Sequence, residues 1–266
     1  ISLSPAIALP DNNERIIESY TLKKNQELCH LNLLNSPPRL HVRYSIGRNG
    51  TAFVYVSGKT YDTGTGDSSI FSSDYSQWAI HHLKEGSMYI IINGTSYGPF
   101  DSADKVKFAK KKGFYFGYQR GKSSYICLNG RELGGYENIE VNPGVNSDCS
   151  RYIFGYRDDG KWFVNNSGTI YGPYENIYNP GLYDEGKKYG YRYSKDKKKF
   201  TCANGDSFGP YDVTIPPVFS ANGSSFGFFY ITGYREGPKK YFININGTEF
   251  GPYVEAGYPE FDSSGQ

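Results

Sequence analysis

The sequence repeats one short motif at nearly regular intervals, and this repetition limits the folds that the chain can adopt. The motif is Tyr-Gly-Pro-Tyr or a close variant, and it occupies Tyr97–Phe100, Leu133–Tyr136, Tyr171–Tyr174, Phe208–Tyr211 and Phe250–Tyr253. The central glycines are 36, 38, 37 and 42 residues apart. A period of this length indicates an array of supersecondary units that bury their apolar faces against one another.

Each unit begins with a strand in which aromatic residues alternate with other residues, as in Phe114, Phe116 and Tyr118. This period of two is typical of a strand with one face in a core. A tight turn and a second strand follow, and the second strand commonly ends in Asn-Gly, which supplies the positive φ angles of a hairpin. A third strand leads into the motif and a fourth follows it. We interpret the Gly-Pro pair as the turn from the outer strand of one unit to the inner strand of the next.

Four short antiparallel strands in about 37 residues predict an all-β fold, a β-propeller of four-stranded blades with six repeats. We expect a single domain, residues 1–266, in which residues 27–252 form the six blades. Residues 1–26 are predicted to be an N-terminal closing segment, and 253–266 a C-terminal closing strand. Seven blades, one of them closed by both termini, are the alternative, because Glu260–Gln266 is similar to the opening of another unit.

Two loops that precede aromatic strands, Phe71–Tyr75 and Phe219–Gly223, read Phe-Ser-Ser-Asp-Tyr and Phe-Ser-Ala-Asn-Gly. They resemble the Phe-Ser-Pro-Asp-Gly loop of TolB-type propeller repeats, and the resemblance extends over roughly residues 27–260. The resemblance implies a propeller that is used mainly for binding or assembly. It carries no reaction with it.

The composition excludes some classes of protein and leaves others open. Only 38% of the residues are hydrophobic, but 26 Tyr and 17 Phe supply rings that can fill a core. The net charge of +2 gives no argument for nucleic-acid binding. No apolar run approaches the ~18 residues that a transmembrane segment needs. The first residues lack an initiator Met, which favours a processed N-terminus, so we predict an extracellular or periplasmic protein.

The cysteines and sequons have simple structural interpretations. Cys127 and Cys202 occupy equivalent strand positions two blades apart, too far for a disulfide, so we predict free thiols without metal-ligand spacing. The chain has four cysteines: Cys29, Cys127, Cys149 and Cys202. Asn-x-Ser/Thr sequons, which fit hairpin turns better than glycosylation, occur at Asn49, Asn93, Asn165, Asn222 and Asn246.

An acidic residue follows the motif in four successive repeats, and these four form the first candidate site: Asp101, Glu137, Glu175 and Asp212. Each opens the inner strand, which lines the central channel of a propeller. Several carboxylates around a channel mouth could bind a cation such as Ca²⁺, or a cationic ligand group. The structural alternative is that each carboxylate accepts hydrogen bonds from the neighbouring blade or lies in solvent.

Basic residues on the hairpin that follows the aromatic strand of each unit form the second candidate site. The predicted basic face contains Arg48, Lys84, Arg120, Arg157, Lys197 and Arg235. Such a face could hold an anionic polymer or an acidic partner by its summed charge. The alternative is that these charges are merely solvated and protect strand edges from aggregation.

No P-loop, dinucleotide fingerprint, nucleophile elbow or zinc-protease motif occurs in the sequence. We therefore predict a non-catalytic binding or assembly module that presents its loops to a protein or surface partner. A carbohydrate-binding lectin with a glycan partner is the first alternative. A propeller hydrolase or lyase is the second, although such enzymes usually break their repeat to place unique acids, whereas the acids here follow it.

Overall fold

The structure of the chain is a computed structural model. It describes residues 2–3, 6–7, 15–16, 20–21, 23, 26–35, 38–46, 52–56, 59–64, 69–74, 76–140, 143–234, 237–262 and 265. Before residue 52, the side chains are described only at positions 23 and 26. The described residues are mostly β-strand, with one short 3₁₀ helix, η1 (Asp184–Gly186), which confirms the predicted all-β class.

The chain divides into two compact units, and each is described by itself. The first comprises residues 1–108, 114–121 and 126–132, and the second comprises 109–113, 122–125 and 133–266. The boundary between them passes through the third repeat. Within every repeat the strands are called A, B, C and D in chain order, from the strand after one motif to the strand that contains the next.

The first unit contains the first two repeats and part of the third. Four two-residue strands open it: β1 (Ser2–Leu3), β2 (Ala6–Ile7), β3 (Arg15–Ile16) and β4 (Tyr20–Thr21). β1 pairs with β4, and β2 pairs with β3. The first repeat contains β5 (Gln26–Asn35), β6 (Pro38–Ile46), β7 (Ala52–Val56) and β8 (Lys59–Gly64). The second contains β9 (Ser69–Phe71), β10 (Trp78–Lys84), β11 (Ser87–Ile92) and β12 (Thr95–Phe100).

The third repeat contains β13 (Ser102–Ala103), β14 (Lys107–Phe108), β15 (Phe114–Arg120), β16 (Ser123–Leu128) and β17 (Arg131–Tyr136). The fourth, in the second unit, contains β18 (Asn138–Ile139), β19 (Gly144–Val145), β20 (Tyr152–Asp158), β21 (Lys161–Asn166) and β22 (Thr169–Tyr174). The fifth contains β23 (Asn176–Tyr183), β24 (Lys188–Lys195), β25 (Lys198–Ala203) and β26 (Asp206–Tyr211). The sixth contains β27 (Val213–Thr214), β28 (Val218–Phe219), β29 (Phe226–Thr232), β30 (Lys240–Ile245) and β31 (Thr248–Tyr253).

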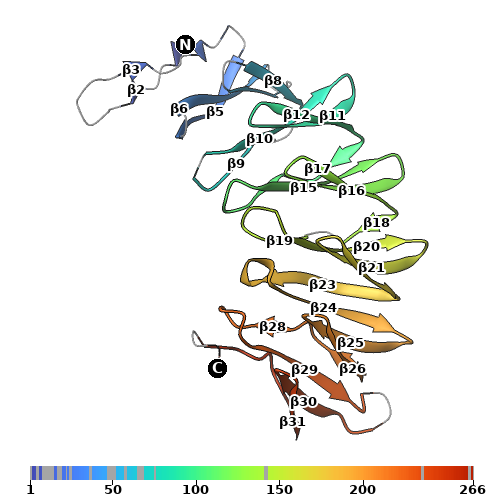
Figure 1. The fold of residues 1–266 in the computed structure, drawn as a ribbon. Coiled ribbons are helices and arrows are strands. Elements are labelled where there is room, and N and C mark those ends of the chain that lie inside the picture. Colours follow the sequence, from blue (N-terminus) through green and yellow to red (C-terminus); the bar gives the residue numbers. More distant parts are fainter. Residues whose placement is uncertain are drawn as a thin grey trace. The chain divides into compact units, whose positions relative to one another are not determined.

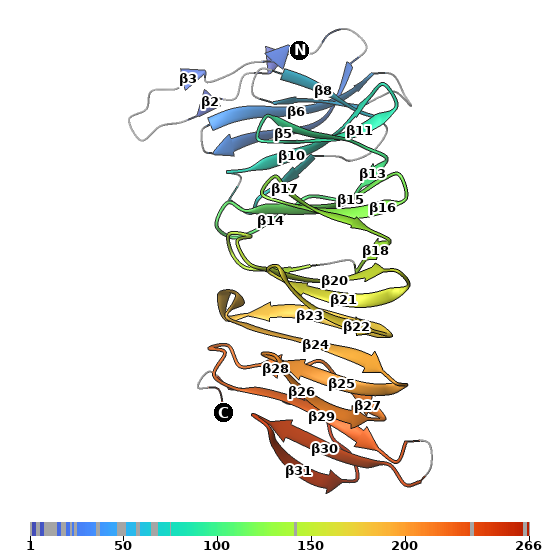
Figure 2. The same cartoon turned by 45° about the vertical axis from the view of Figure 1, so that its right-hand side comes forward.

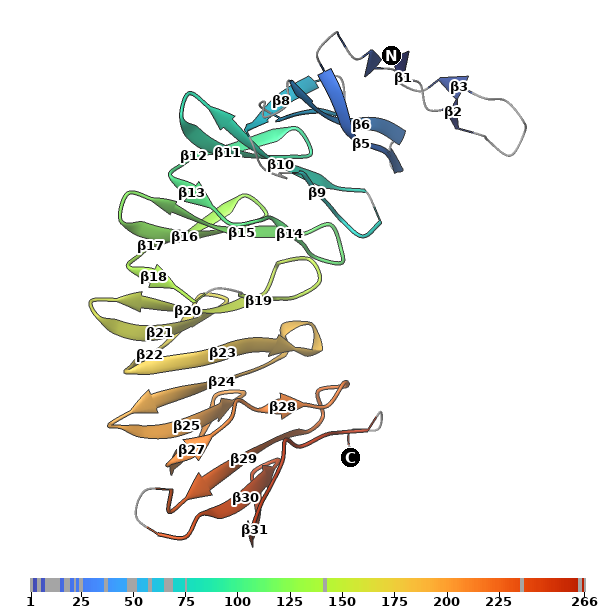
Figure 3. The same ribbon diagram turned by 180° about the vertical axis from the view of Figure 1, so that it is seen from behind.

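Within each repeat, strands A, B, C and D pair in chain order to form one antiparallel sheet, as Figure 1 shows for the labelled strands. The fifth repeat has the plain order β23-β24-β25-β26, which can be followed in Figure 2. In the sixth, strand A is divided into β27 and β28, which both pair with β29 (Figure 3). Asn93, Asn129 and Asn246 have positive φ at the tight turns between strands C and D. The predicted all-β fold of four-stranded antiparallel sheets is confirmed.

The Gly-Pro motif lies inside strand D, and the interpretation of Gly-Pro as a turn between blades is wrong. Tyr171 pairs with Val164, whereas Tyr174, three residues later, pairs with Trp162, only two residues away on strand C. The extra residue is a β-bulge at Gly172-Pro173. Residues three apart in a regular strand point to opposite faces, so the bulge is what returns both tyrosines to the same face.

Glycine is required at this bulge for two reasons. Gly172 has φ of +130°, which L side chains rarely adopt. A Cβ atom there would also lie 2.9 Å from Cδ1 of Phe163. The Gly-Pro peptide bonds of the second, fourth, fifth and sixth repeats are all cis.

The paired aromatic residues of each motif complete the core of the next repeat. In the second unit, Tyr174 lies 4.2 Å from Tyr193, and Tyr211 lies 3.8 Å from Tyr230, measured between ring centroids. In the first unit, Phe100 lies 4.2 Å from Tyr118 in the same way. Aromatic pairs of this kind contribute about 0.5–1.5 kcal/mol beyond the area that they bury. These motif aromatics therefore pack from one repeat against the next.

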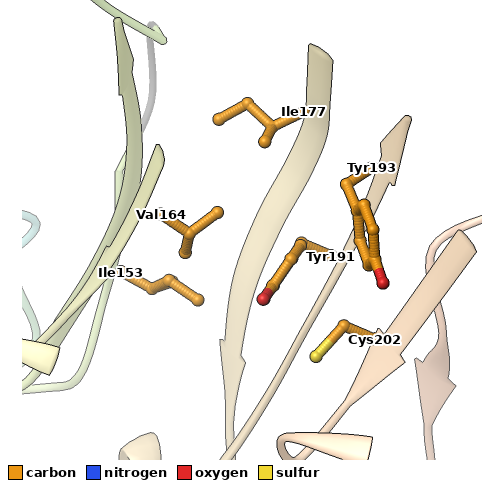
Figure 4. Close-up of a cluster of buried hydrophobic side chains, with 6 residues drawn as sticks. All are labelled: Ile153, Val164, Ile177, Tyr191, Tyr193 and Cys202. Atoms are coloured by element: carbon orange, nitrogen blue, oxygen red, sulfur yellow. The ribbon is translucent and has the colours of Figure 1, made fainter. Parts of the chain in front are cut away.

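Figure 4 shows one such core in the second unit, between the fourth and fifth repeats. Ile153 and Val164 of the fourth repeat point toward Tyr191 of the fifth, and all three are at most 1% exposed. Tyr191 keeps a polar partner because its hydroxyl lies 3.0 Å from that of Tyr174. The cores are therefore built between sheets, from alternating strand residues that the sequence predicts.

The last repeat presents the same face without a following sheet among the described residues. Phe250 and Tyr253, its motif aromatics, are 46% and 45% exposed. Residues 254–262 continue along this face, where Tyr258 contacts Phe229 at 5.5 Å between ring centroids. Gly265 donates its N–H to the Asp262 carbonyl at 3.0 Å, as Gly223 does to Ser220 at 2.9 Å one repeat earlier. The repeat pattern therefore continues through the last described residues.

Candidate functional site

The four predicted channel-mouth carboxylates hold hairpins. Each lies where strand A begins and accepts a backbone N–H from the B–C hairpin of its own sheet. The donor–acceptor distances are 2.6 Å from Gly121 to Asp101, 3.3 Å from Gly160 to Glu137, 3.2 Å from Lys197 to Glu175 and 3.2 Å from Tyr234 to Asp212. These bonds are of the structural kind that we weighed as the alternative to cation binding, although the donors lie in the same sheet.

The acidic and basic candidate residues meet at one edge of the sheets. Arg157 forms an ion pair with Glu137, with 3.7 Å between Nε and Oε2, and Lys198 Nζ lies 2.9 Å from Asp212 Oδ1. The Lys198 ammonium, together with the Tyr234 N–H, lowers the pKa of Asp212. Water and salt screen exposed pairs of this kind, so they contribute little to stability. Their main effect is to cancel part of the charge that either set would present to a partner.

The remaining basic residues of the predicted face are solvent-exposed where they are described. Lys84, Arg120 and Lys197 are all exposed, and Arg120 forms an ion pair with Glu132 at 3.3 Å. Arg48 and Arg235 lie outside the described residues. Further exposed lysines at the hairpins of the described chain are Lys122, Lys161, Lys195, Lys239 and Lys240.

A metal site has no geometric support in the described part of the chain. No group of three or more His, Cys, Asp or Glu side chains is placed there to hold an ion. Asp101 belongs to the first unit, whereas Glu137, Glu175 and Asp212 stand in three successive sheets of the second. Ca²⁺ binding at these carboxylates stays a prediction.

The described cysteines are buried and free. Cys127, Cys149 and Cys202 form no disulfide, and the side chain of Cys29 lies outside the described residues. Burial raises the pKa of Cys127 and of Cys149 to about 11. The neutral thiol is the form that persists near neutral pH, and it is a poor nucleophile.

The four sequon asparagines in the described part of the chain all hold turns through a side-chain oxygen that accepts a backbone N–H. Asn93 accepts the Trp78 N–H at 2.9 Å, and Asn246 accepts the Phe226 N–H at 2.8 Å, so each links the C–D hairpin to the start of strand B. Asn165, which is 5% exposed, accepts the Gly168 N–H at 2.8 Å. Asn49 lies outside the described residues, and Asn222 is exposed in the loop before β29.

One polar group that the sequence analysis missed lies between the fifth and sixth sheets. Arg192 on β24 and Lys199 on β25 both stand over the ring of Tyr178 on β23. The signal was present in the repeat alignment, since Arg192 occupies the position of Gly155 one repeat earlier. It was overlooked because no known motif contains it.

The described residues include no helix that is long and apolar enough to cross a membrane. No protein-family model matches the sequence, and no curated protein matches it either.

Several solved structures are similar to the chain at low sequence identity. The tricorn protease is 13% identical with a TM-score of 0.42, and the match covers 89% of this chain and 28% of that one. TolB from Acinetobacter baumannii is 15% identical with a TM-score of 0.32, covering 84% and 61%. The Dos1 propeller is 10% identical with a TM-score of 0.38, covering 98% and 77%. The chain thus spans about a quarter of the tricorn protease chain and about three fifths of TolB.

Proposed function

We propose that the chain is a non-catalytic β-propeller-type module that binds a protein partner through the edge formed by its B–C hairpins. One observation carries this proposal. The carboxylate at the start of strand A accepts a backbone N–H from the B–C hairpin, as Glu137 does from Gly160. These bonds fix the turn residues of each hairpin, as at Gly160 and Lys197, while the flanking strand-end lysines Lys161 and Lys195 stay exposed. Loops held in one conformation lose less entropy on binding, which favours their use as contact surfaces.

The chemistry of the edge supports a protein partner of acidic character. Exposed lysines alternate with ion-paired residues along this edge. Tyr234 is 49% exposed and adds an aromatic surface. It lies beside Lys239, whose Nζ is 4.5 Å from the centroid of the Tyr234 ring. Tyrosine is enriched at protein interfaces, and the summed charge of the lysines would attract an acidic partner. An extracellular or periplasmic location remains a prediction from the sequence.

The test measures binding of poly-L-glutamate, a mimic of an acidic protein surface, by the full chain at low and high salt. The double variant Lys161→Glu/Lys195→Glu should weaken binding about tenfold, because two favourable charges become repulsive. The control is Lys110→Glu, an exposed lysine in the loop between β14 and β15, beyond the opposite end of strand B.

Two results together support the proposal: the wild type loses binding at high salt, and the Lys110→Glu variant binds as well as the wild type. Equal losses in both variants, or no binding at low salt, would refute it. Polygalacturonate serves as an acidic glycan probe, and its preference over poly-L-glutamate would favour the lectin alternative.

A further inference from the structure

The interface between the fifth and sixth repeats is polar where the equivalent interfaces are mostly apolar. Arg192 on strand B pairs with Thr201 on strand C. The equivalent pairs are His81 with Ile90, Gly155 with Val164, and Phe229 with Ile243. Lys199, opposite Tyr211 of strand D, takes the place held by Met88, Trp162 and Tyr241 in other repeats. Departures from a repeat that cost buried apolar surface are expected at functional sites.

Arg192 has an unused donor inside the protein. Its Nη1 donates to the Thr214 carbonyl at 3.0 Å, and its guanidinium carbon lies 4.0 Å from the centroid of the Tyr178 ring. Its Nε is buried and has no hydrogen-bond partner. A buried donor without a partner costs about 1–3 kcal/mol, and the cost is greater for a charged group. A ligand that accepts a hydrogen bond from Nε would remove this cost.

Lys199 adds a second positive charge over the same ring. Its Nζ lies 5.8 Å from the Tyr178 centroid and donates to Ser194 Oγ at 2.7 Å. Ser194 is 1% exposed, and the neighbouring Thr201 and Thr214 are 0% exposed. The Thr201 and Thr214 hydroxyls bond each other at 2.7 Å. The two cations therefore stand beside a buried layer of hydroxyl groups.

No described carboxylate forms an ion pair with either cation. Two acids at the start of strand A in the fifth and sixth repeats are already engaged: Glu175 accepts the Lys197 N–H, and Asp212 binds Lys198 and the Tyr234 N–H. Two like charges that share one aromatic ring without an anion repel each other. The arrangement is electrostatically incomplete, and an anion would complete it.

We propose that Arg192, Lys199 and Tyr178 form a binding site for an oxyanion, a carboxylate or phosphate group carried by the partner. The inference rests on the proposed function and names the group that this site recognises. Because Nη1 is taken by the Thr214 carbonyl, the guanidinium edge that carries Nε and Nη2 is the one that binds the oxyanion through two parallel hydrogen bonds. Lys199 supplies the second charge, and the Tyr178 ring holds both cations in place.

The experiment titrates the full chain with sodium phosphate and, separately, with sodium acetate, while sodium chloride keeps the ionic strength constant. Two readouts are followed: the melting temperature, and the ¹⁵N–¹H resonance of Arg192 Nε, assigned by its absence in Arg192→Met. We expect a saturable rise in melting temperature and a matching shift of this resonance, with a dissociation constant of about 1–10 mM. The oxyanion with the lower constant identifies the preferred source.

The variants separate a built site from general surface charge. Arg192→Met should abolish the response, and Lys199→Met should weaken it about tenfold while leaving the Arg192 resonance visible. Lys110→Met removes an exposed charge from the loop between β14 and β15 and should change nothing. Equal loss in Lys110→Met, or no saturable shift of the Arg192 resonance in the wild type with either anion, would overturn the inference.

The failure of this inference is distinguishable from failure of the proposed function. If poly-L-glutamate binds the hairpin edge but neither small anion shifts the Arg192 resonance, the oxyanion site is wrong and the binding edge stands. If the small anions bind while the polymer does not, the site stands and the hairpin edge is wrong.

Discussion

The outer strands of the fifth and sixth repeats have the same sequence pattern but different surroundings. Phe208 of the fifth packs against Phe228, with 5.4 Å between the ring centroids, and lies half-buried. Phe250, its counterpart in the sixth, is 46% exposed. The difference extends to strand C, where Thr201 is 0% exposed and Ile243 is half-buried. One motif therefore yields a core contact or an apolar surface, depending on what stands opposite it.

The largest expected effect is a difference in stability between alanine variants of the two outer strands. Phe208→Ala should lower the free energy of unfolding by about 2–3 kcal/mol, somewhat below the usual cost of a fully buried phenylalanine. Phe250→Ala should lower it by less than about 1 kcal/mol, because much of its ring already contacts water. Urea denaturation of both variants, followed by far-UV circular dichroism, measures the two values. Equal losses would mean that Phe250 is covered in solution.

The bulge glycines should be costly to replace in both strands, which tests whether the bulge is local. Gly209 and Gly251 have φ of +140° and +135°. A Cβ atom would lie 2.7 Å from Phe200 Cδ1 in the first case and 2.8 Å from Phe242 Cδ1 in the second. Gly209→Ala and Gly251→Ala should therefore each cost about 1–3 kcal/mol. Thermal unfolding provides the comparison, and an unaffected Gly251→Ala variant would show that the bulge depends on the next sheet.

The smallest expected effect concerns alkaline pH. Burial raises the pKa of Tyr211 from its ordinary value of 10.0 to about 12, so the folded protein favours the neutral phenol. Its contribution is complete below pH 10.0 and is lost as the pH rises from there toward about 12, because the unfolded chain ionises first. The fall in urea midpoint between about pH 9 and about pH 11 measures this loss.

A matched pair of variants isolates the tyrosine. Tyr211→Phe should reduce the alkaline fall in midpoint, although Tyr174, whose pKa is likewise raised by burial to about 12, retains its own share. Tyr253→Phe, at the exposed counterpart, should leave the fall unchanged. An identical response in both variants would contradict the assignment of this pH dependence to buried motif tyrosines.

The strand pattern could be predicted from the sequence because it depends on local rules. Alternation in Phe114, Phe116 and Tyr118 identified strand B, and Asn-Gly identified the C–D hairpins. The bulge could not be predicted so easily, because Gly-Pro is equally common in turns between strands. The spacing contained the evidence: two core aromatics three residues apart on one strand require an extra residue between them.

The candidate site was predictable only in part. The register placed Asp101, Glu137, Glu175 and Asp212 at the start of strand A, but a one-dimensional pattern does not reveal that a hairpin N–H lies within reach of each. Arg192 could not be found from its neighbours in the sequence. Its unusual charge becomes visible only when it is compared with the residues at the equivalent position of the other repeats. Aligning every strand position across repeats, and asking where charge replaces apolar residues, would have found it.

The packing of strand D on the following sheet has a consequence for excising part of the array. A fragment cut at the sequence repeat, from Asn176 to Tyr211, would lose the Tyr171 and Tyr174 rings that cover Tyr191. A permuted fragment from Thr169 to Ala203 would keep these rings with strands A to C of the fifth repeat. The sequence repeat and the packed layer of motif aromatics are therefore out of phase by one strand, and truncations should follow the packing.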